Sequence, residues 1–230
     1  MKIKIYIINL KRSKHRRKHM AEQLKATKIK YDFVDAVDGK NKDKSDFKQY
    51  NQNTINITGK DLKPTEIGAF LSHEKAIKQA KTDKVDWAIV LEDDVVVSKH
   101  FNDILRHIEN NKSLDVIRMY VRNAGIAQTP TYTEKRNTYG NWGGALGYAI
   151  SKSGVNKFLK VSDNFSIKID NFLFGYWLHG LKICQTDKNL VDIENTIDSD
   201  IGYNKTDKPA TKPLTRLVYK VKYFIQSLTN

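Results

Sequence analysis

The chain has 230 residues, of which 40% are hydrophobic and 10% aromatic, enough to bury the core of one domain or, with less margin, two. Forty Lys and Arg against 26 Asp and Glu give a formal net charge of +14. Such a surface should attract polyanions, whether nucleic acid, anionic lipid or phosphorylated substrates. The composition is that of a globular protein and excludes an intrinsically disordered chain.

The cysteine content and the N-terminal segment bear on the compartment. Cys184 is the single cysteine, which excludes an internal disulfide and fits a reducing environment. The apolar run at residues 3–10 precedes a basic cluster, which is the reverse of a secretory signal. No uncharged apolar stretch reaches the roughly 18 residues that span a bilayer. We therefore expect a cytoplasmic protein.

The first elements along the chain alternate between strand and helix. The β-branched run at residues 3–10 predicts a strand buried on both faces, and Ser13 is placed to cap a basic helix that ends near residue 26. Residues 31–37 predict a second strand, which ends at an Asp-Gly turn. This order is typical of a parallel α/β sheet.

The middle of the chain predicts a long helix and a central strand. Residues 40–60 are polar and are expected to form a surface excursion, after which Pro64 opens a helix over residues 64–81 with apolar side chains at helical spacing. Residues 87–91 predict another buried strand, which leads directly into the acidic triplet Glu92-Asp93-Asp94.

The rest of the chain shows no internal repeat and no domain linker. We expect one domain over residues 1–205 and a basic amphipathic tail over 206–230. The same patterns predict the remaining elements of the domain: a helix at 101–109, a strand at 115–121, an irregular loop at 129–141, a glycine-containing turn and strand at 142–150, and helices at 151–159 and 169–178.

The acidic triplet is the best-defined candidate site. In open α/β sheets, ligands bind beyond the carboxyl ends of the strands. Alternation along the strand places Glu92 and Asp94 on one side and Asp93 on the other. Two convergent carboxylates can hold a hard divalent cation and leave positions for phosphate oxygens, which suits a leaving nucleoside diphosphate. The plain alternative is a solvated acidic turn.

Several segments match one pattern in order along the chain. They are Ile7-Ile8-Asn9-Leu10 followed by Arg12 and Arg16, residues 35–39, residues 66–73 of Gly-x-x-Leu-Ser-His type, residues 91–94, residues 143–148, Ile169-Asp170 and Ser199-Asp200-Ile201. Together they resemble glycosyltransferase family 25, the lipooligosaccharide glycosyltransferases, over roughly residues 3–202. The helix motif and the acidic triplet are the most specific pieces.

The resemblance implies a fold and an activity. The fold is GT-A, an α/β class with a Rossmann-like mixed, mostly parallel sheet flanked by helices. The activity is inverting transfer of a hexose, by family default galactose from UDP-galactose, onto a lipooligosaccharide acceptor. The implied cofactor is Mn²⁺ or Mg²⁺, held by Asp94 and Glu92 in what resembles the family's metal-binding motif.

The nucleotide sugar is expected to meet the end of the first strand. Asn9, Leu10 and Arg12 lie there, and Arg16, about one helical turn further on, is placed to reach the phosphates, because guanidinium matches phosphate geometry. Ser72-His73 and Glu92 are expected to complete the nucleotide pocket. A buried structural histidine and a solvated basic helix are the plain alternatives for His73 and Arg16.

Inversion by direct displacement needs a carboxylate that takes the proton of the acceptor hydroxyl. Asp170 is the first candidate, although aspartate at the start of a helix is often only an N-cap. Asp93 or Glu92 could serve instead if Asp94 alone holds the metal, and Asp187 is a weaker candidate. Aromatic side chains around the glycine-containing turn, Tyr139, Trp142 and Tyr148, could stack on sugar rings, although aromatic residues around turns more often serve packing alone.

The basic tail and the net charge suggest partners. Residues 214–228 alternate cationic with apolar side chains and fit a helix lying on the inner face of the cytoplasmic membrane. A terminal helix docked on the core is the alternative. A nucleic-acid-binding protein is a rival reading, but the basic residues are dispersed. A metal-dependent nucleotidyltransferase is a second rival, but the sequence contains no P-loop motif that would support it.

Overall fold

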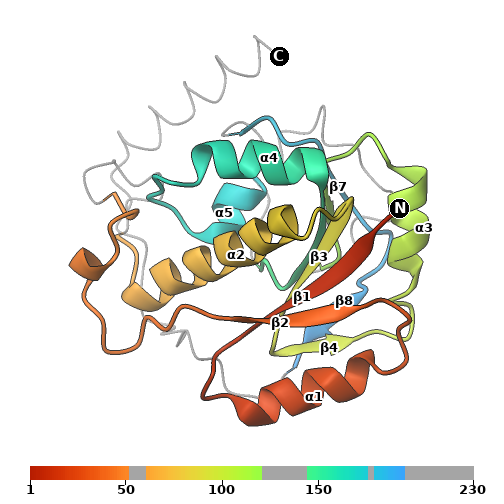
Figure 1. Cartoon of the computed structure of the whole chain (residues 1–230), viewed down its shortest axis with the longest axis horizontal. Helices are drawn as coiled ribbons and strands as arrows, with labels where there is room; N and C mark the ends of the chain where they lie inside the picture. Colours follow the sequence, from red (N-terminus) through yellow and green to blue (C-terminus); the bar gives the residue numbers. More distant parts are fainter. Residues whose placement is uncertain (52–60, 121–143, 176–178, 195–230) are drawn as a thin grey trace.

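The fold is seen in a computed structural model that describes residues 1–51, 61–120, 144–175 and 179–194 (Figure 1). The loop expected at 129–141, the Ser199-Asp200-Ile201 motif and the tail at 206–230 lie outside the described residues, so the division at residue 205 stays a prediction. In the described part of the chain, no helix has both the length and the apolar character needed to cross a membrane.

Strands and helices alternate through most of the described chain. In order they are β1 (Ile3–Asn9), α1 (Lys14–Leu24), β2 (Tyr31–Asp35), η1 (Lys44–Asp46, a 3-10 helix), α2 (Pro64–Thr82), β3 (Trp87–Glu92), β4 (Val95–Val97), α3 (Asp103–Asn110), β5 (Val116–Arg118), β6 (Gly147–Ser151), α4 (Lys152–Val161), α5 (Ile169–Leu173), β7 (Ile183–Gln185) and β8 (Val191–Ile193).

Six strands form one sheet in the order β2-β1-β3-β6-β5-β7, and β4 pairs with β8 in a small second sheet. β6 runs antiparallel to both of its neighbours, while the other adjacent pairs of the large sheet are parallel. The predicted mixed, mostly parallel sheet flanked by helices, the arrangement expected of a GT-A fold, is therefore confirmed.

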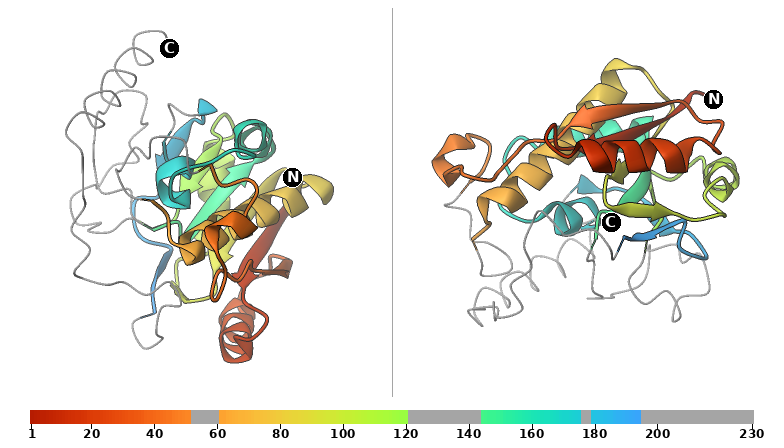
Figure 2. Two further views of the ribbon diagram at one scale, coloured as in Figure 1. Left: turned by 90° about the vertical axis from the view of Figure 1, so that its left-hand side faces the viewer. Right: turned by 90° about the horizontal axis from the view of Figure 1, so that it is seen from below.

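Helices cover both faces of the sheet, which explains why its central strands are apolar on both sides. Along β1, Tyr6 and Ile8 face a core shared with α2, α4 and α5, whereas Ile5 and Ile7 face a second core shared with α1 and α3. The views in Figure 2 show α1 on the opposite side of the sheet from α2.

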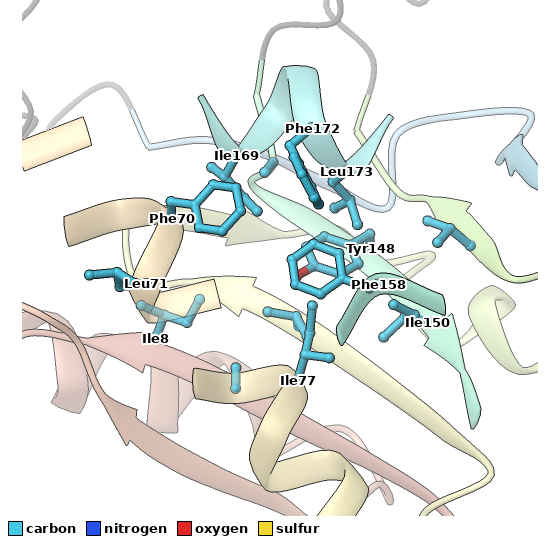
Figure 3. Packing of buried hydrophobic residues seen from close by; sticks show 14 of the residues in the cluster. Ile8, Phe70, Leu71, Ile77, Tyr148, Ile150, Phe158, Ile169, Phe172 and Leu173 are labelled. Carbon is cyan, nitrogen blue, oxygen red and sulfur yellow. The ribbon is translucent and has the colours of Figure 1, made fainter. Parts of the chain in front are cut away.

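Aromatic rings hold α2, α4 and α5 together on the first face (Figure 3). Phe70 of α2 lies edge-on to Phe172 of α5, with ring centroids 5.0 Å apart, and Phe172 lies edge-on to Phe158 of α4 at 5.3 Å. The ring of Tyr148 from β6 lies inside the same cluster and is fully buried. Tyr148 therefore cannot stack on a sugar ring, and the packing alternative is the one that holds for this residue.

Some element boundaries differ from the sequence expectations. The helix expected over 169–178 ends at Leu173, and the strand expected over 115–121 forms ladder pairs only at Val116–Arg118. Ser13 sits at the N-cap of α1, but its side chain makes no capping hydrogen bond. The short strands β4, β7 and β8 carry little periodicity and form because tertiary partners complete their ladders.

Helix α2 lies very close to the segment at residues 36–39, which follows β2. Ser72 Oγ accepts a hydrogen bond from the Val37 amide at 2.8 Å and donates to the Gly68 carbonyl at 2.6 Å. A Cβ added at Gly68 would lie 2.6 Å from the Val37 carbonyl oxygen, and one added at Gly39 would lie 2.1 Å from the Pro64 carbonyl oxygen. Glycine at both positions thus allows the backbones to touch.

We expect Gly68→Ala to lower the free energy of unfolding by about 2 kcal/mol, because the new methyl group must push α2 away from residues 36–39. Helix propensity alone predicts the opposite sign, a gain of up to about 1 kcal/mol. Urea denaturation followed by circular dichroism measures the change. A variant as stable as the parent would contradict the close contact.

Candidate functional site

A cleft opens where β1, β2 and β3 end at their carboxyl termini, since these three strands are parallel and finish at the same edge of the sheet. Its open volume is about 640 Å³, including the solvent space at its mouth. The cleft is lined by residues from the end of β1, from α1, from the segment after β2, from α2 and from the acidic triplet: Ile8, Leu10, Arg12, Arg16, Ala36, Val37, Asp38, Gly39, Thr65, Ala69, Ser72, His73, Glu92, Asp93 and Asp94.

Asp93 is bound from two sides by buried partners. Its Oδ2 accepts a hydrogen bond from Asn9 Nδ2 at 2.6 Å, and its Oδ1 accepts one from Arg16 Nη1 at 3.0 Å. Burial raises the pKa of Asp93, and the contacts with Asn9 and Arg16 oppose that rise. All three side chains are buried. This triad joins β1, α1 and the turn after β3 beneath the cleft.

Asp94, unlike Asp93, is not fully hydrogen-bonded by its described neighbours. Its Oδ1 is buried and has no hydrogen-bond partner among the described residues. Its Oδ2 lies 3.9 Å from Arg16 Nη1, a long contact for an ion pair. Burial, followed by the charges of Glu92 and Asp93, raises the pKa of Asp94 to about 7. The protein thus holds a carboxylate whose charge its own neighbours disfavour, and a cation would relieve that repulsion.

Glu92, the last residue of β3, faces α2 across the cleft. Its Oε1 lies 3.3 Å from His73 Nε2, and the other ring nitrogen of His73 lies 3.1 Å from the hydroxyl of Tyr148 on β6. His73 and Tyr148 are almost completely buried, whereas the Glu92 side chain is 22% exposed. Burial, and then the charge of Glu92, raises the pKa of Tyr148 well above its usual value, so the phenol stays protonated.

The mouth of the cleft carries both positively and negatively charged side chains. Arg12, just past β1, forms an ion pair with Asp38, and both side chains are well exposed. Lys11 lies 3.3 Å from Asp35 at the neighbouring strand end. Exposed pairs of this kind contribute little to stability, so they can open at small cost for a charged ligand.

Asp170 does not line this cleft. It lies in the first turn of α5, whose N-cap is Lys168, so the plain N-cap alternative does not describe it. Its Oδ2 accepts a long hydrogen bond of 3.3 Å from the Gly144 amide and its Oδ1 accepts from the Asn171 amide at 2.8 Å. Burial raises the pKa of Asp170, and Glu92 is close enough to add to the rise.

The surroundings of Glu92 and Asp94 indicate whether these two carboxylates could bind a divalent cation. The described residues contain no group of three or more His, Cys, Asp or Glu side chains arranged to hold a metal. Glu92 and Asp94 nevertheless offer two carboxylates, one with a buried and unsatisfied oxygen. Mg²⁺ and similar ions are commonly bound by one or two carboxylates together with substrate phosphates and water, and this donor set fits that arrangement.

The structure brings most of the expected site residues together. Leu10, Arg12, Arg16, Ser72, His73, Glu92, Asp93 and Asp94 line one cleft, Asn9 lies behind it against Asp93, and Asp170 lies outside its lining. The role of each residue stays a prediction. Asp187 is elsewhere, 3.3 Å from His107 of α3.

Two residues near the site were missed by the sequence reasoning. Asp38 lines the cleft, and its place in the Asp-Gly pair after the second predicted strand could have indicated this. Arg118 is buried with its guanidinium over the Phe174 ring at 4.2 Å, close enough to Asp170 for their charges to interact. No local sequence signal marks Arg118, because its neighbours come from distant segments.

We expect Asp93→Asn and Asp94→Asn to change stability in opposite ways. Asp93→Asn removes the anion paired with buried Arg16 and should lower the free energy of unfolding by about 3 kcal/mol. Asp94→Asn removes a charge that its neighbours repel, so the melting temperature should stay equal or rise. Metal-free thermal unfolding of both variants measures this difference, and a large loss for Asp94→Asn would contradict it.

Comparison with known proteins adds a family assignment. The family model described as Glycosyltransferase family 25 (LPS biosynthesis protein) matches residues 2–173, which include the cleft, the acidic triplet and α5. Procollagen galactosyltransferase 2 of Mus musculus is 31% identical over 186 residues, and the protein of that name from Homo sapiens is 29% identical over 185. Each match covers 74% of this chain but only 29% of the relative's length.

Solved structures show weaker likeness. A glycosyltransferase involved in the glycosylation of the major capsid of PBCV-1 has a TM-score of 0.46 at 12% identity, with 80% of this chain and 81% of the other covered. S. aureus TarS has a TM-score of 0.49 at 16% identity, with 83% and 60% covered. At these values the structural likenesses carry no argument about the site.

Proposed function

The chain belongs to glycosyltransferase family 25, and on that premise we propose that it is an inverting, metal-dependent hexosyltransferase that uses a UDP-sugar. One observation supports the proposal most strongly. The cleft at the carboxyl ends of β1 and β3 holds Asp94, whose buried carboxylate oxygen has no partner among the described residues. An anion kept in such an environment is a candidate functional group rather than a structural one.

The divalent cation, Mn²⁺ or Mg²⁺, is held by Asp94 and Glu92 in this proposal. When bound, it neutralises the negative charge that develops on the diphosphate as the sugar leaves. The cleft's own residues bind and orient the nucleotide. Leu10 and Ser72 line its walls. Arg12, at the mouth, leaves its ion pair with Asp38 and binds the diphosphate oxygens instead.

Arg16 and Asn9 act beneath the nucleotide rather than on it. Their hydrogen bonds to Asp93 hold the turn that carries Asp94. Arg16 lines the cleft and still presents a positive charge 3.9 Å from Asp94, so it can contribute to the field at the phosphates without leaving Asp93.

Asp170 is our preferred base for the acceptor hydroxyl. Asp93 is hydrogen-bonded by the buried cation of Arg16, which favours its ionised form and opposes the rise in its pKa, so it is the weaker proton acceptor. Among the described residues, Asp170 accepts hydrogen bonds from two backbone amides, one of them at the long distance of 3.3 Å, and burial raises its pKa. A raised carboxylate pKa favours proton acceptance near neutral pH.

Galactose from UDP-galactose is the donor to test first, because two relatives are named as galactosyltransferases. The family description as an LPS biosynthesis protein supports a lipooligosaccharide acceptor. A cytoplasmic location, with the basic tail at 206–230 on the inner membrane surface, fits such an acceptor. We propose no nucleic-acid partner.

A panel of UDP-sugars tests the reaction class and the donor. We expect slow release of UDP from one sugar only when Mn²⁺ is present, and at least a hundredfold less release by Asp94→Ala, because the variant loses a ligand of the cation. Coupled assays that separately detect UDP and pyrophosphate measure the product. Pyrophosphate release would favour the nucleotidyltransferase alternative, and metal-independent UDP release would contradict the metal's role.

Asp170→Asn tests the base. We expect kcat to fall by about a hundredfold or more, since the variant cannot accept the hydroxyl proton, whereas UDP affinity measured by calorimetry should stay within about twofold. The substitution keeps the side-chain shape and the acceptor oxygen for one amide bond. Loss of UDP affinity instead of kcat would place Asp170 on the donor side and contradict its assignment as base.

A further inference from the structure

A line of hydrogen bonds leads from the core of the protein to the cleft. It begins at the hydroxyl of Tyr148 on β6, passes through both ring nitrogens of His73 on α2, and ends at the Glu92 carboxylate on β3, with distances of 3.1 and 3.3 Å. Tyr148 is 0% exposed and His73 is 1% exposed. Glu92 and His73 line the cleft, whereas Tyr148 lies behind them in the core.

The strand register explains how the three side chains meet. Tyr148 pairs with Val90 across the antiparallel β3–β6 ladder, two residues before Glu92 on the same strand. Alternation therefore places Tyr148 and Glu92 on the face of the sheet that α2 covers. His73 descends from α2 between them, and its ring stacks on that of Tyr148 with centroids 5.8 Å apart and an interplanar angle of 21°.

The chemistry of the groups sets the direction of donation. An ionised carboxylate only accepts hydrogen bonds, so His73 Nε2 must carry the proton that faces Glu92. In the neutral ring, Nδ1 is then an acceptor, and the Tyr148 hydroxyl donates to it. The Glu92 carboxylate thus selects the tautomer with the proton on Nε2, and Tyr148 satisfies the remaining Nδ1 acceptor and holds the ring in place.

We propose that Tyr148 and His73 are positioning residues that hold the Glu92 carboxylate toward the cleft, ready for the cation and the diphosphate. This inference rests on the proposed function for the role of Glu92. Tyr148 does not line the cleft, and His73, although it lines the cleft, is only 1% exposed and acts through Glu92. Ligand carboxylates are themselves held by outer hydrogen bonds, and removal of such a bond commonly costs 10–100-fold in metal affinity or activity.

Two substitutions of His73 separate positioning from simple packing. In His73→Gln, the side-chain amide can occupy the place of Nε2 and donate to Glu92. In His73→Asn, the shorter amide occupies the place of Nδ1, reaches Tyr148 and leaves Glu92 without its donor. Both remove the ring and both are neutral, but Asn is one methylene shorter and a poorer helix former, so a purely structural role predicts a difference in stability and no separate difference in ligand binding.

Calorimetric titration of the full chain with UDP in the presence of Mn²⁺ compares the two variants. We expect His73→Asn to bind at least about tenfold more weakly than His73→Gln, at a temperature at which melting curves show both variants to be fully folded. Equal weakening in both would overturn the positioning role, even if wild-type protein binds UDP as the proposed function requires.

Tyr148→Phe has a matched control. Tyr6 is also 0% exposed, and its hydroxyl bonds Asp83 at the far end of α2, 2.9 Å away. Tyr148→Phe and Tyr6→Phe each remove one buried phenol hydroxyl, so both should lose stability. Only Tyr148→Phe should weaken binding of UDP with Mn²⁺, by about three- to tenfold. An equal effect of both, or none for Tyr148→Phe, would overturn the proposal.

A readout that needs no ligand keeps this inference separate from the proposed function. Long-range ¹H–¹⁵N spectra of the histidine rings report which nitrogen carries the proton. We expect His73 in the wild-type protein to be protonated at Nε2 with an unprotonated Nδ1, and Tyr148→Phe to shift the Nδ1 resonance because Nδ1 loses its hydrogen-bond donor. A proton on Nδ1 alone in the wild type would overturn the proposal. Failure of UDP binding would refute the proposed function only.

Discussion

The buried contact of Asp93 with Asn9 and Arg16 organises the whole site. Three consecutive carboxylates at the end of one strand would repel each other and disorder the turn. One of them is neutralised by a buried guanidinium and an amide, which ties the turn to β1 and α1. All three carboxylates line the cleft, and Asp94 keeps a buried oxygen that has no hydrogen-bond partner among the described residues. The structural contact of Asp93 thus lies directly beside Asp94, the carboxylate that we propose to hold the cation.

The second constraint is the close approach of α2 to the segment after β2. Gly39 and Gly68 allow the backbones to touch, and Ser72 bonds both sides of the contact. Because His73 follows Ser72 directly, the same contact fixes the height of His73 above the sheet. The helix that forms one wall of the cleft therefore also delivers the donor to Glu92.

Periodic segments were predictable from the sequence, and contacts between distant segments were not. β1, β3 and α2 carry long apolar patterns and lie where these patterns placed them. The three-residue strands β4, β7 and β8 depend on partners far along the chain. In the site, Glu92 faces α2 and Asp93 faces α1, but the expected grouping of Asp94 with Glu92 by strand alternation does not apply, because β3 ends at Glu92 and both aspartates lie in a turn near Arg16. That Arg16 binds Asp93, and that Tyr148 is buried against His73, depends on packing that no local pattern encodes.

Electron paramagnetic resonance of Mn²⁺ tests the central claim, that Asp94 and Glu92 form with a nucleotide diphosphate a cation site that neither completes alone. Free Mn²⁺ gives a sharp signal that is lost on binding. We expect the wild-type chain to remove little of this signal by itself, and UDP to increase the bound fraction well beyond that of UDP alone. Asp94→Asn should abolish the increase. Equal binding by Asp94→Asn, or no effect of UDP on the wild type, would contradict the account.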